Sequence, residues 1–296
     1  MPTPRLPAPP VRRPPRAGYA RLVAASALLA GCALPALVLP RARAPFRPAA
    51  PALRGAPLYL YPAYGPAPDS ARPPRALVVF FGNDVGFWRA HERLAELLSA
   101  HGYAVAGLDV RRVLNALPNG AARESVYLAR VDTLITRARA ALGAGDRPLV
   151  ITGHSIGGEL ALWTAAHLRA PGRGSGGGEP DLAGVVSLSP GRRGHLRTGL
   201  SDMLGREPHG AGSFAVDSEV ARLTRRTPPV PVALVRGTRD GFRRADPAIV
   251  AAGARRFVVE GQGHSLLNLR ATGPVVLDAL AFVLGGGAAA PAAPSR

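Results

Sequence analysis

The fold is decided by residues 149–158, which read LVITGHSIGG. The first four residues of this stretch predict a buried strand, and Gly158–Leu168 predict the helix that follows. Between them, GHSIG places Ser155 on a sharp strand-to-helix turn, the context in which a nucleophilic serine is presented. Such a turn strains the serine backbone, so the residues two positions away must leave room for it. We interpret Ser155 as a candidate nucleophile and Gly153 and Gly157 as the glycines of its elbow.

Outward from this turn, apolar runs and amphipathic segments alternate along the chain. This alternation predicts a parallel sheet with helices on both faces, built as one domain over residues 58–284. No internal repeat of fixed period interrupts it. We expect strands at 58–61, 76–81, 103–110, 148–152, 185–188, 230–235 and 256–260, and helices at 91–100, 122–142, 158–168 and 275–284.

A serine hydroxyl becomes a good nucleophile only when a base removes its proton. We favour His264 as that base, because it follows the last predicted strand and ligand chemistry collects at the carboxyl edge of a parallel sheet. Three other histidines are predicted at the surface in or near helices: His91, His101 and His167. Two lie in a polar insertion, His195 and His209. His154 adjoins the serine, but its ring is expected to be directed elsewhere.

The acid that orients the base is expected after the penultimate strand. Asp240 follows that strand and a glycine turn, and would hold His264 in the tautomer that accepts the serine proton. Asp246 is the nearest rival, although a helix N-cap before a proline explains it equally well. Glu260 is the second rival, and Asp109 is interpreted as structural.

The order Ser155, Asp240, His264, each after its own strand, resembles the α/β-hydrolase superfamily over nearly all of 58–284. The resemblance implies a mostly parallel eight-strand sheet and a short lid insertion at 191–229. It also implies an oxyanion hole formed by the backbone N–H of Ile156 and a second N–H from Asn83 or a neighbour in residues 82–88. No metal or organic cofactor is implied.

Within the superfamily, residues 81–88, FGNDVGFW, and the later Ser189-Pro190 are similar to bacterial virulence proteins of the VirJ/AcvB group. That group is extracytoplasmic, so the similarity implies hydrolysis of an ester in the cell envelope, with aminoacylated phospholipids as one candidate. The segment departs from the group at residues 83–85, where Asn-Asp-Val replaces an Asp-Gly-Gly core, and the elbow sequence differs as well.

The N-terminus predicts export. Residues 1–21 carry five Arg and no acid, and residues 22–40 are an apolar run, as in a secretory signal. Within the run, LAGC resembles a bacterial lipobox and places the only cysteine, Cys32, at the lipidation site. An uncleaved membrane anchor and simple secretion are the alternatives. We therefore expect a signal peptide or anchor at 1–31, a Pro/Ala/Arg linker at 32–57, and a disordered tail at 285–296.

The composition excludes several classes of protein. One cysteine rules out a disulfide scaffold, and the abundant Gly and Pro follow no Gly-X-Y period. The net charge of +18 comes from 37 basic residues, all Arg, which favours a coding bias over a nucleic-acid surface. The same bias explains the Arg-rich insertion 191–229 as a solvated face, although a basic lid that attracts phosphate or carboxylate groups is the alternative.

Two classes of function remain open at this stage. The first is an extracytoplasmic serine hydrolase that cleaves an ester, or a thioester or amide, of a small molecule or lipid. It would contact the membrane through its N-terminus and bind no nucleic acid. The second is a non-catalytic binding protein on the same fold, since a fold does not fix a function. Acyl transfer to an acceptor other than water is a further alternative.

Overall fold

The computed structural model describes residues 56–63, 73–168, 182–197 and 212–285. The predictions made for segment 1–31 with Cys32, for nearly all of the linker 32–57 and for the tail from residue 286 lie outside these residues. Within the described ranges, no helix is long and apolar enough to cross a membrane.

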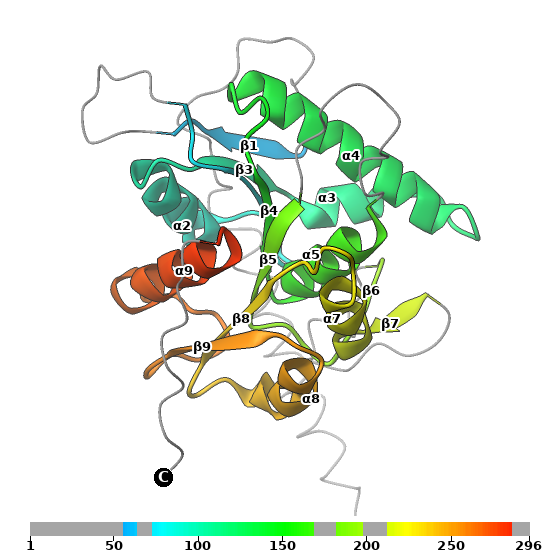
Figure 1. Cartoon of the computed structure of the whole chain (residues 1–296). Helices are drawn as coiled ribbons and strands as arrows, with labels where there is room; N and C mark the ends of the chain where they lie inside the picture. Colours follow the sequence, from blue (N-terminus) through cyan, green and yellow to red (C-terminus); the bar gives the residue numbers. More distant parts are fainter. Residues whose placement is uncertain (1–55, 64–72, 169–181, 198–211, 286–296) are drawn as a thin grey trace, which may run out of the picture. The chain divides into compact units, whose positions relative to one another are not determined.

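A seven-stranded sheet lies at the centre of the described residues (Figure 1). Its strand order is β1-β3-β2-β4-β5-β8-β9; β1 is antiparallel to β3, and every other pair is parallel. The predicted parallel sheet is therefore confirmed. The strands are β1 (Leu58–Tyr61), β2 (Leu77–Phe81), β3 (Ala104–Leu108), β4 (Leu149–His154), β5 (Leu182–Leu188), β8 (Val232–Gly237) and β9 (Arg255–Val259).

The count of strands differs from the eight that the resemblance implies. Each of the seven strands coincides with an apolar run of the sequence, whereas no run was available for an eighth among the residues that the structure describes. The remaining strands, β6 (Arg193–His195) and β7 (Ser213–Ala215), form a separate antiparallel pair inside the predicted insertion. Both are only three residues long, too short to show an apolar run or an alternating pattern, which is why the sequence did not predict them.

Helices cover both faces of the sheet, because its strands are apolar on both sides. Side chains of β2 alternate between two cores, with Phe81 in one and Phe80 in the other. The first core is covered by α3, α4, α5, α7 and α8, and the second by α2 and α9 (Figure 1). The helices are α2 (Arg89–Ala100), α3 (Val110–Asn115), α4 (Arg123–Ala141), α5 (Ile156–His167), α7 (Val216–Thr224), α8 (Asp246–Ala251) and α9 (Leu269–Val283).

One helix boundary and one strand boundary differ from the predictions for local reasons. The helix expected to begin at Val275 begins at Leu269, because the Asn268 side chain accepts a hydrogen bond from the Arg270 N–H and caps it. The strand expected to reach Val110 ends at Leu108. There Asp109 accepts a hydrogen bond from a backbone N–H in the next turn and begins α3, so its role is structural as predicted.

Candidate active site

Ser155 lies at the turn between β4 and α5 with φ 57° and ψ −126°. A positive φ is strained for a residue that carries a side chain. The turn is so tight that only glycine fits at positions 153 and 157. A Cβ on Gly153 would lie 2.0 Å from the carbonyl oxygen of Gly157, and a Cβ on Gly157 would lie 2.0 Å from that of Gly82. The turn therefore presses against the end of β2, and any side chain at either glycine would collide with backbone.

The structure brings Ser155, Asp240 and His264 together at the carboxyl edge of the sheet. His264 Nε2 lies 2.9 Å from Ser155 Oγ, and Nδ1 lies 3.3 Å and 3.4 Å from the two Asp240 carboxylate oxygens. With the proton on Nδ1, the ring donates to the carboxylate and accepts from the hydroxyl. The Asp240 side chain is inaccessible to solvent, whereas that of His264 is 34% exposed. This arrangement can take a proton from the serine and stabilise the resulting imidazolium.

Asp240 is held as an anion by three donors. Arg236 Nη1 donates to Oδ2 at 2.8 Å, and the Phe242 N–H donates to Oδ1 at 2.9 Å. Burial raises the pKa of Asp240, but the hydrogen bonds from His264, Arg236 and the Phe242 N–H outweigh it and hold the pKa well below the ordinary carboxyl range. The acid therefore stays charged, as an orienting carboxylate must.

The two rival acids lie elsewhere. Asp246 begins α8 and accepts a hydrogen bond from Arg236 Nε at 2.9 Å. It is therefore an ion-pair partner and not the N-cap that its position before a proline suggested; the N-cap is Ala245. Glu260 follows β9 and is exposed.

The segments expected to form the oxyanion hole are adjacent. Ile156 is the first residue of α5, where backbone N–H groups have no acceptor within the helix. Asn83 follows β2, whose end contacts the start of α5 through Gly157. The carbonyl of Asn83 accepts the Gly86 N–H at 2.9 Å and its side chain accepts the Val85 N–H at 3.2 Å, which fixes a tight turn at this point.

One prediction about the histidines was wrong: His91, expected at the surface, is only 3% exposed. His154, whose ring was expected to be directed elsewhere than the serine, bonds the backbone of His264. His154 Nε2 lies 2.8 Å from the carbonyl oxygen of His264, and His91 Nε2 lies 3.2 Å from His154 Nδ1. A signal existed for His91, because it shares a helical stripe with the buried Leu94 and Leu98.

The sequence also missed two residues around the triad. Arg236 is 2% exposed although it carries a charge, and it binds both Asp240 and Asp246. The ring of Phe242 packs on the ring of His264 with 4.8 Å between centroids. Phe242 thus contacts both members of the His–Asp pair, one through its ring and one through its N–H.

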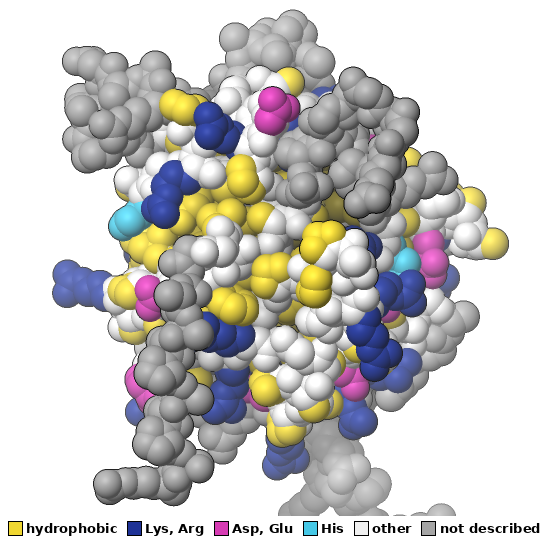
Figure 2. All heavy atoms as spheres, viewed as in Figure 1, with side chains coloured by type: hydrophobic (Ala, Val, Ile, Leu, Met, Phe, Trp, Pro, Cys, Tyr) yellow, Lys and Arg dark blue, Asp and Glu magenta, His cyan; other side chains and the backbone are white. Residues whose placement is uncertain are grey.

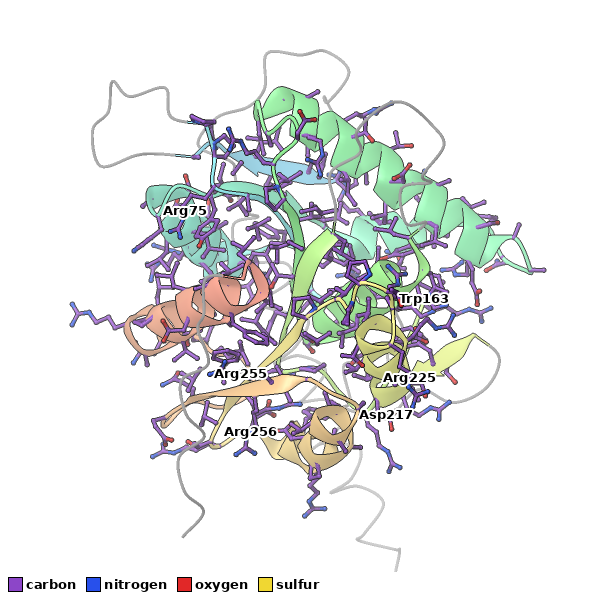
Figure 3. The ribbon with its side chains drawn as sticks, viewed as in Figure 1. Arg75, Trp163, Asp217, Arg225, Arg255 and Arg256 are labelled. Carbon is purple, nitrogen blue, oxygen red and sulfur yellow. The ribbon has the colours of Figure 1, made fainter. Side chains whose placement is uncertain are left out.

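The insertion is anchored beside the elbow. Glu159, on the first turn of α5, accepts the Gly191 N–H at 2.8 Å, so it binds the start of the insertion. At the far end of the insertion, α7 packs on α5. The ring of Phe214 lies 6.0 Å from the ring of Trp163, measured between centroids; Trp163 is labelled in Figure 3. Residues 198–211, with Arg206 and His209, lie outside the described part.

The arginines of the insertion do not converge. Among the residues of the insertion that the structure describes, four arginines are exposed: Arg192, Arg197, Arg222 and Arg225. Arg226 Nη2 instead donates to the backbone carbonyl of Ala166 at 2.7 Å, and Arg193 donates to the Ser213 hydroxyl at 3.0 Å. On the face seen in Figure 2, basic side chains form a group along the right edge and also lie on other parts of the described surface. This distribution favours the solvated Arg-rich face over a basic lid.

Among the residues placed by the structure, no three His, Cys, Asp or Glu side chains gather in a way that could hold a metal ion.

Comparisons with solved structures show the fold. A puromycin hydrolase in complex with PGG has a TM-score of 0.50 at 19% identity, over 77% of this chain and 37% of that one. Est1E from Butyrivibrio proteoclasticus has a TM-score of 0.48 at 16% sequence identity, and the match covers 76% of this chain and 94% of the Est1E chain. A monoglyceride lipase from Saccharomyces cerevisiae has a TM-score of 0.48 at 15% sequence identity, and the match covers 84% of this chain and 100% of the lipase chain. No protein-family model and no curated protein matches the chain. The strand order, together with the likeness at a TM-score of 0.50, shows an α/β-hydrolase fold.

Proposed function

We propose that this chain is a serine hydrolase that cleaves carboxylic esters through an acyl-enzyme. The observation that carries the proposal is the 2.9 Å contact between His264 Nε2 and Ser155 Oγ, on a ring whose Nδ1 faces the buried carboxylate of Asp240. A non-catalytic binding protein would need neither this alignment nor the strained backbone at Ser155.

The first half of the reaction acylates the enzyme. Ser155 Oγ attacks the ester carbonyl carbon while His264 Nε2 takes the hydroxyl proton, and Asp240 stabilises the imidazolium through Nδ1–H. The carbonyl oxygen becomes an oxyanion, which the N–H groups of Ile156 and Asn83 would bind; such donors contribute about 3 to 4 kcal/mol each. Collapse of the intermediate breaks the bond to the leaving alkoxide, which takes the proton from His264 Nε2.

The second half returns the enzyme. Water replaces the alcohol, His264 Nε2 takes one of its protons, and the hydroxide oxygen attacks the acyl carbon. When the second intermediate collapses, the bond to Ser155 Oγ breaks and His264 returns the proton to that oxygen. The products are a carboxylic acid and the free enzyme.

The substrate and the location form the finer part of the proposal. The signal-like segment 1–40 supports an extracytoplasmic enzyme, anchored at Cys32 or by the apolar run itself. The similarity of residues 81–88 to the VirJ/AcvB group supports a lipid headgroup ester as the substrate. Thioesters and amides pass through the same tetrahedral intermediate and remain in the proposal.

The test is labelling of the purified protein with a fluorophosphonate probe, which reacts only with an activated serine. Wild-type protein should be labelled, and Ser155→Ala and His264→Ala should not. Ser265→Ala is the matched control, because this serine adjoins the base but lies outside the triad, and its variant should be labelled normally. If the folded wild-type protein is not labelled, the hydrolase proposal is wrong and a binding role is favoured.

A further inference from the structure

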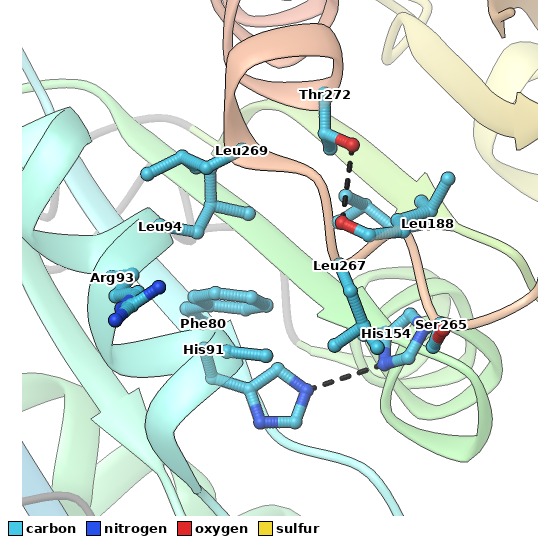
Figure 4. Close-up of a pocket in the computed structure, with 12 residues that line it drawn as sticks. Phe80, His91, Arg93, Leu94, His154, Leu188, Ser265, Leu267, Leu269 and Thr272 are labelled. Carbon is cyan, nitrogen blue, oxygen red and sulfur yellow. Dashed lines mark hydrogen bonds between the residues drawn. The ribbon is translucent and has the colours of Figure 1, made fainter. Parts of the chain in front are cut away.

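Two buried histidines that the proposed mechanism does not use connect three segments of the candidate site, namely the nucleophile elbow, the loop of His264 and the loop after β2. His154 directly precedes Ser155, and its Nε2 bonds the backbone carbonyl of His264 at 2.8 Å. His91 lies behind it on α2, with Nε2 3.2 Å from His154 Nδ1 (Figure 4). The chain of contacts ends at Trp88, whose N–H lies 3.3 Å from His91 Nδ1, at the end of the loop that begins with Gly82.

The hydrogen bonds fix the tautomer of both rings. Because the Trp88 N–H can only donate, His91 Nδ1 must accept, so the proton of a neutral His91 is on Nε2. That Nε2–H donates to His154 Nδ1, which places the proton of His154 on Nε2 as well. The His154 Nε2–H then donates to the His264 carbonyl, which can only accept. All three contacts are satisfied when both rings are neutral, and protonation of either ring breaks one of them.

The surroundings of the pair favour this neutral state. The rings lie in a cavity lined by Phe80, Leu94, Leu188 and Leu266, with Arg93 at its rim on the side of α2 (Figure 4). Burial, followed by the charge of the other ring, lowers the pKa of His91 well below its ordinary value.

Burial is also the main cause for His154, lowering its pKa to about 4. The titratable groups that face it, besides His91, are His264, which lowers the pKa through its charge and raises it through its carbonyl, and Asp240, which raises it.

We propose that His91 and His154 are positioning residues that hold the main chain of His264, so that its Nε2 stays in hydrogen-bond reach of Ser155. The inference rests on the proposed roles of Ser155 and His264. The anchor of the base ends β4 and directly precedes the nucleophile, so one stretch of backbone positions both groups. A displacement of about 1 Å between reacting groups can lower the rate about 100-fold. A single hydrogen bond that holds the backbone of His264 can therefore affect the rate of the reaction.

The first test separates the hydrogen bond from the bulk of the ring. His154→Phe keeps a ring and removes the donor to His264, and kcat for p-nitrophenyl acetate should fall about 100-fold. KM should stay within about twofold, since the ester-binding surface is unchanged. His154→Gln can place an amide N–H near the lost Nε2–H and should recover at least about 10-fold of kcat.

The matched control is His167→Phe. This histidine ends α5, donates a hydrogen bond from Nδ1 to the backbone carbonyl of Trp163 and packs on the Trp163 ring, but it is outside the chain of contacts. Its kcat should be that of wild type. A folded His154→Phe protein with unchanged kcat would overturn the proposal, and so would a Gln variant no better than Phe.

The second test does not depend on activity. In protein labelled with ¹⁵N at histidine, the ring nitrogens of His91 and His154 should show neutral rings protonated at Nε2 at pH 6. An Nδ1–H tautomer or a charged ring there would overturn the role of the pair alone. Failure of the wild-type protein to react with fluorophosphonate would instead overturn the proposed function, and the positioning role with it.

Discussion

Arg236 lies beneath Asp240 and donates from Nη1 to its Oδ2 at 2.8 Å, with 2% of the arginine exposed. The same guanidinium donates from Nε to Asp246 and from Nη2 to the carbonyl of Pro190, at 2.9 Å and 2.7 Å. One buried cation thus binds the acid of the candidate triad, the start of α8 and the segment after β5. These bonds are shorter than those from His264 to Asp240, so the arginine, more than the base, fixes the position of the acid.

Replacing Arg236 should destabilise the whole fold. Arg236→Met leaves two buried carboxylates without their cation, and breaking a buried pair in this way costs about 3 to 5 kcal/mol. The measurement is the free energy of unfolding in urea. The matched control is Arg256→Met, since Arg256 (Figure 3) is 53% exposed and 4.0 Å from Asp246; its cost should stay below about 1 kcal/mol. Equal losses in the two variants would contradict the argument.

The two carboxylates that share Arg236 should differ in their effect on catalysis. Asp240→Asn replaces the acceptor of the His264 Nδ1–H by an amide that can favour the wrong tautomer, and kcat should fall by about 10⁴-fold. Asp246→Asn is the control, because it contacts the same arginine and not the histidine. Its folded protein should keep kcat within about 10-fold. Initial rates on p-nitrophenyl acetate decide the case, and a reversed order would make Asp246 the acid.

The strain at Ser155 should be measurable as stability. Glycine adopts a φ of 57° without penalty, whereas serine pays about 1 to 3 kcal/mol there, so Ser155→Gly should raise the unfolding free energy by about 1 kcal/mol while abolishing activity. Ser265→Gly is the comparison at a residue without positive φ, and it should lower stability. A less stable Ser155→Gly protein would show that the elbow is not strained.

The buried histidines should make the fold sensitive to mild acid. The pKa of His154 is about 4 in the folded state and about 6.5 when unfolded, so the unfolded state binds more protons between these values. The contribution of neutral His154 to the free energy of unfolding, roughly 3 kcal/mol, is therefore fully present above pH 6.5 and is lost as the pH falls to about 4. Urea unfolding at pH 7, 6 and 5 should show this slope in wild type and a smaller one in His154→Phe. Parallel slopes would refute it.

Much of the site could be predicted from the sequence because its signals are local. The apolar run 149–152, the two glycines of the elbow and the helix after them lie within one continuous stretch, and their geometry follows from steric limits on the backbone. Asp240 and His264 were placed by a general property of parallel sheets, whose loops all emerge at the carboxyl edge. The strand order then brings the three loops together.

The partners of the buried polar groups could not be predicted in this way. Whether His91 and Arg236 are solvated or buried depends on which helices and strands pack over them, and sequence periodicity does not show that packing. His154 binds a carbonyl 110 residues away, and Asp246 meets Arg236 only because α8 folds back on β8. Sequence periodicity predicted the seven strands of the sheet, the helices α2, α4, α5 and α9, and the turn that carries the candidate nucleophile. The exclusion of water by tertiary packing decided which charges and rings must pair, because a polar group becomes obliged to find a partner only once it is buried.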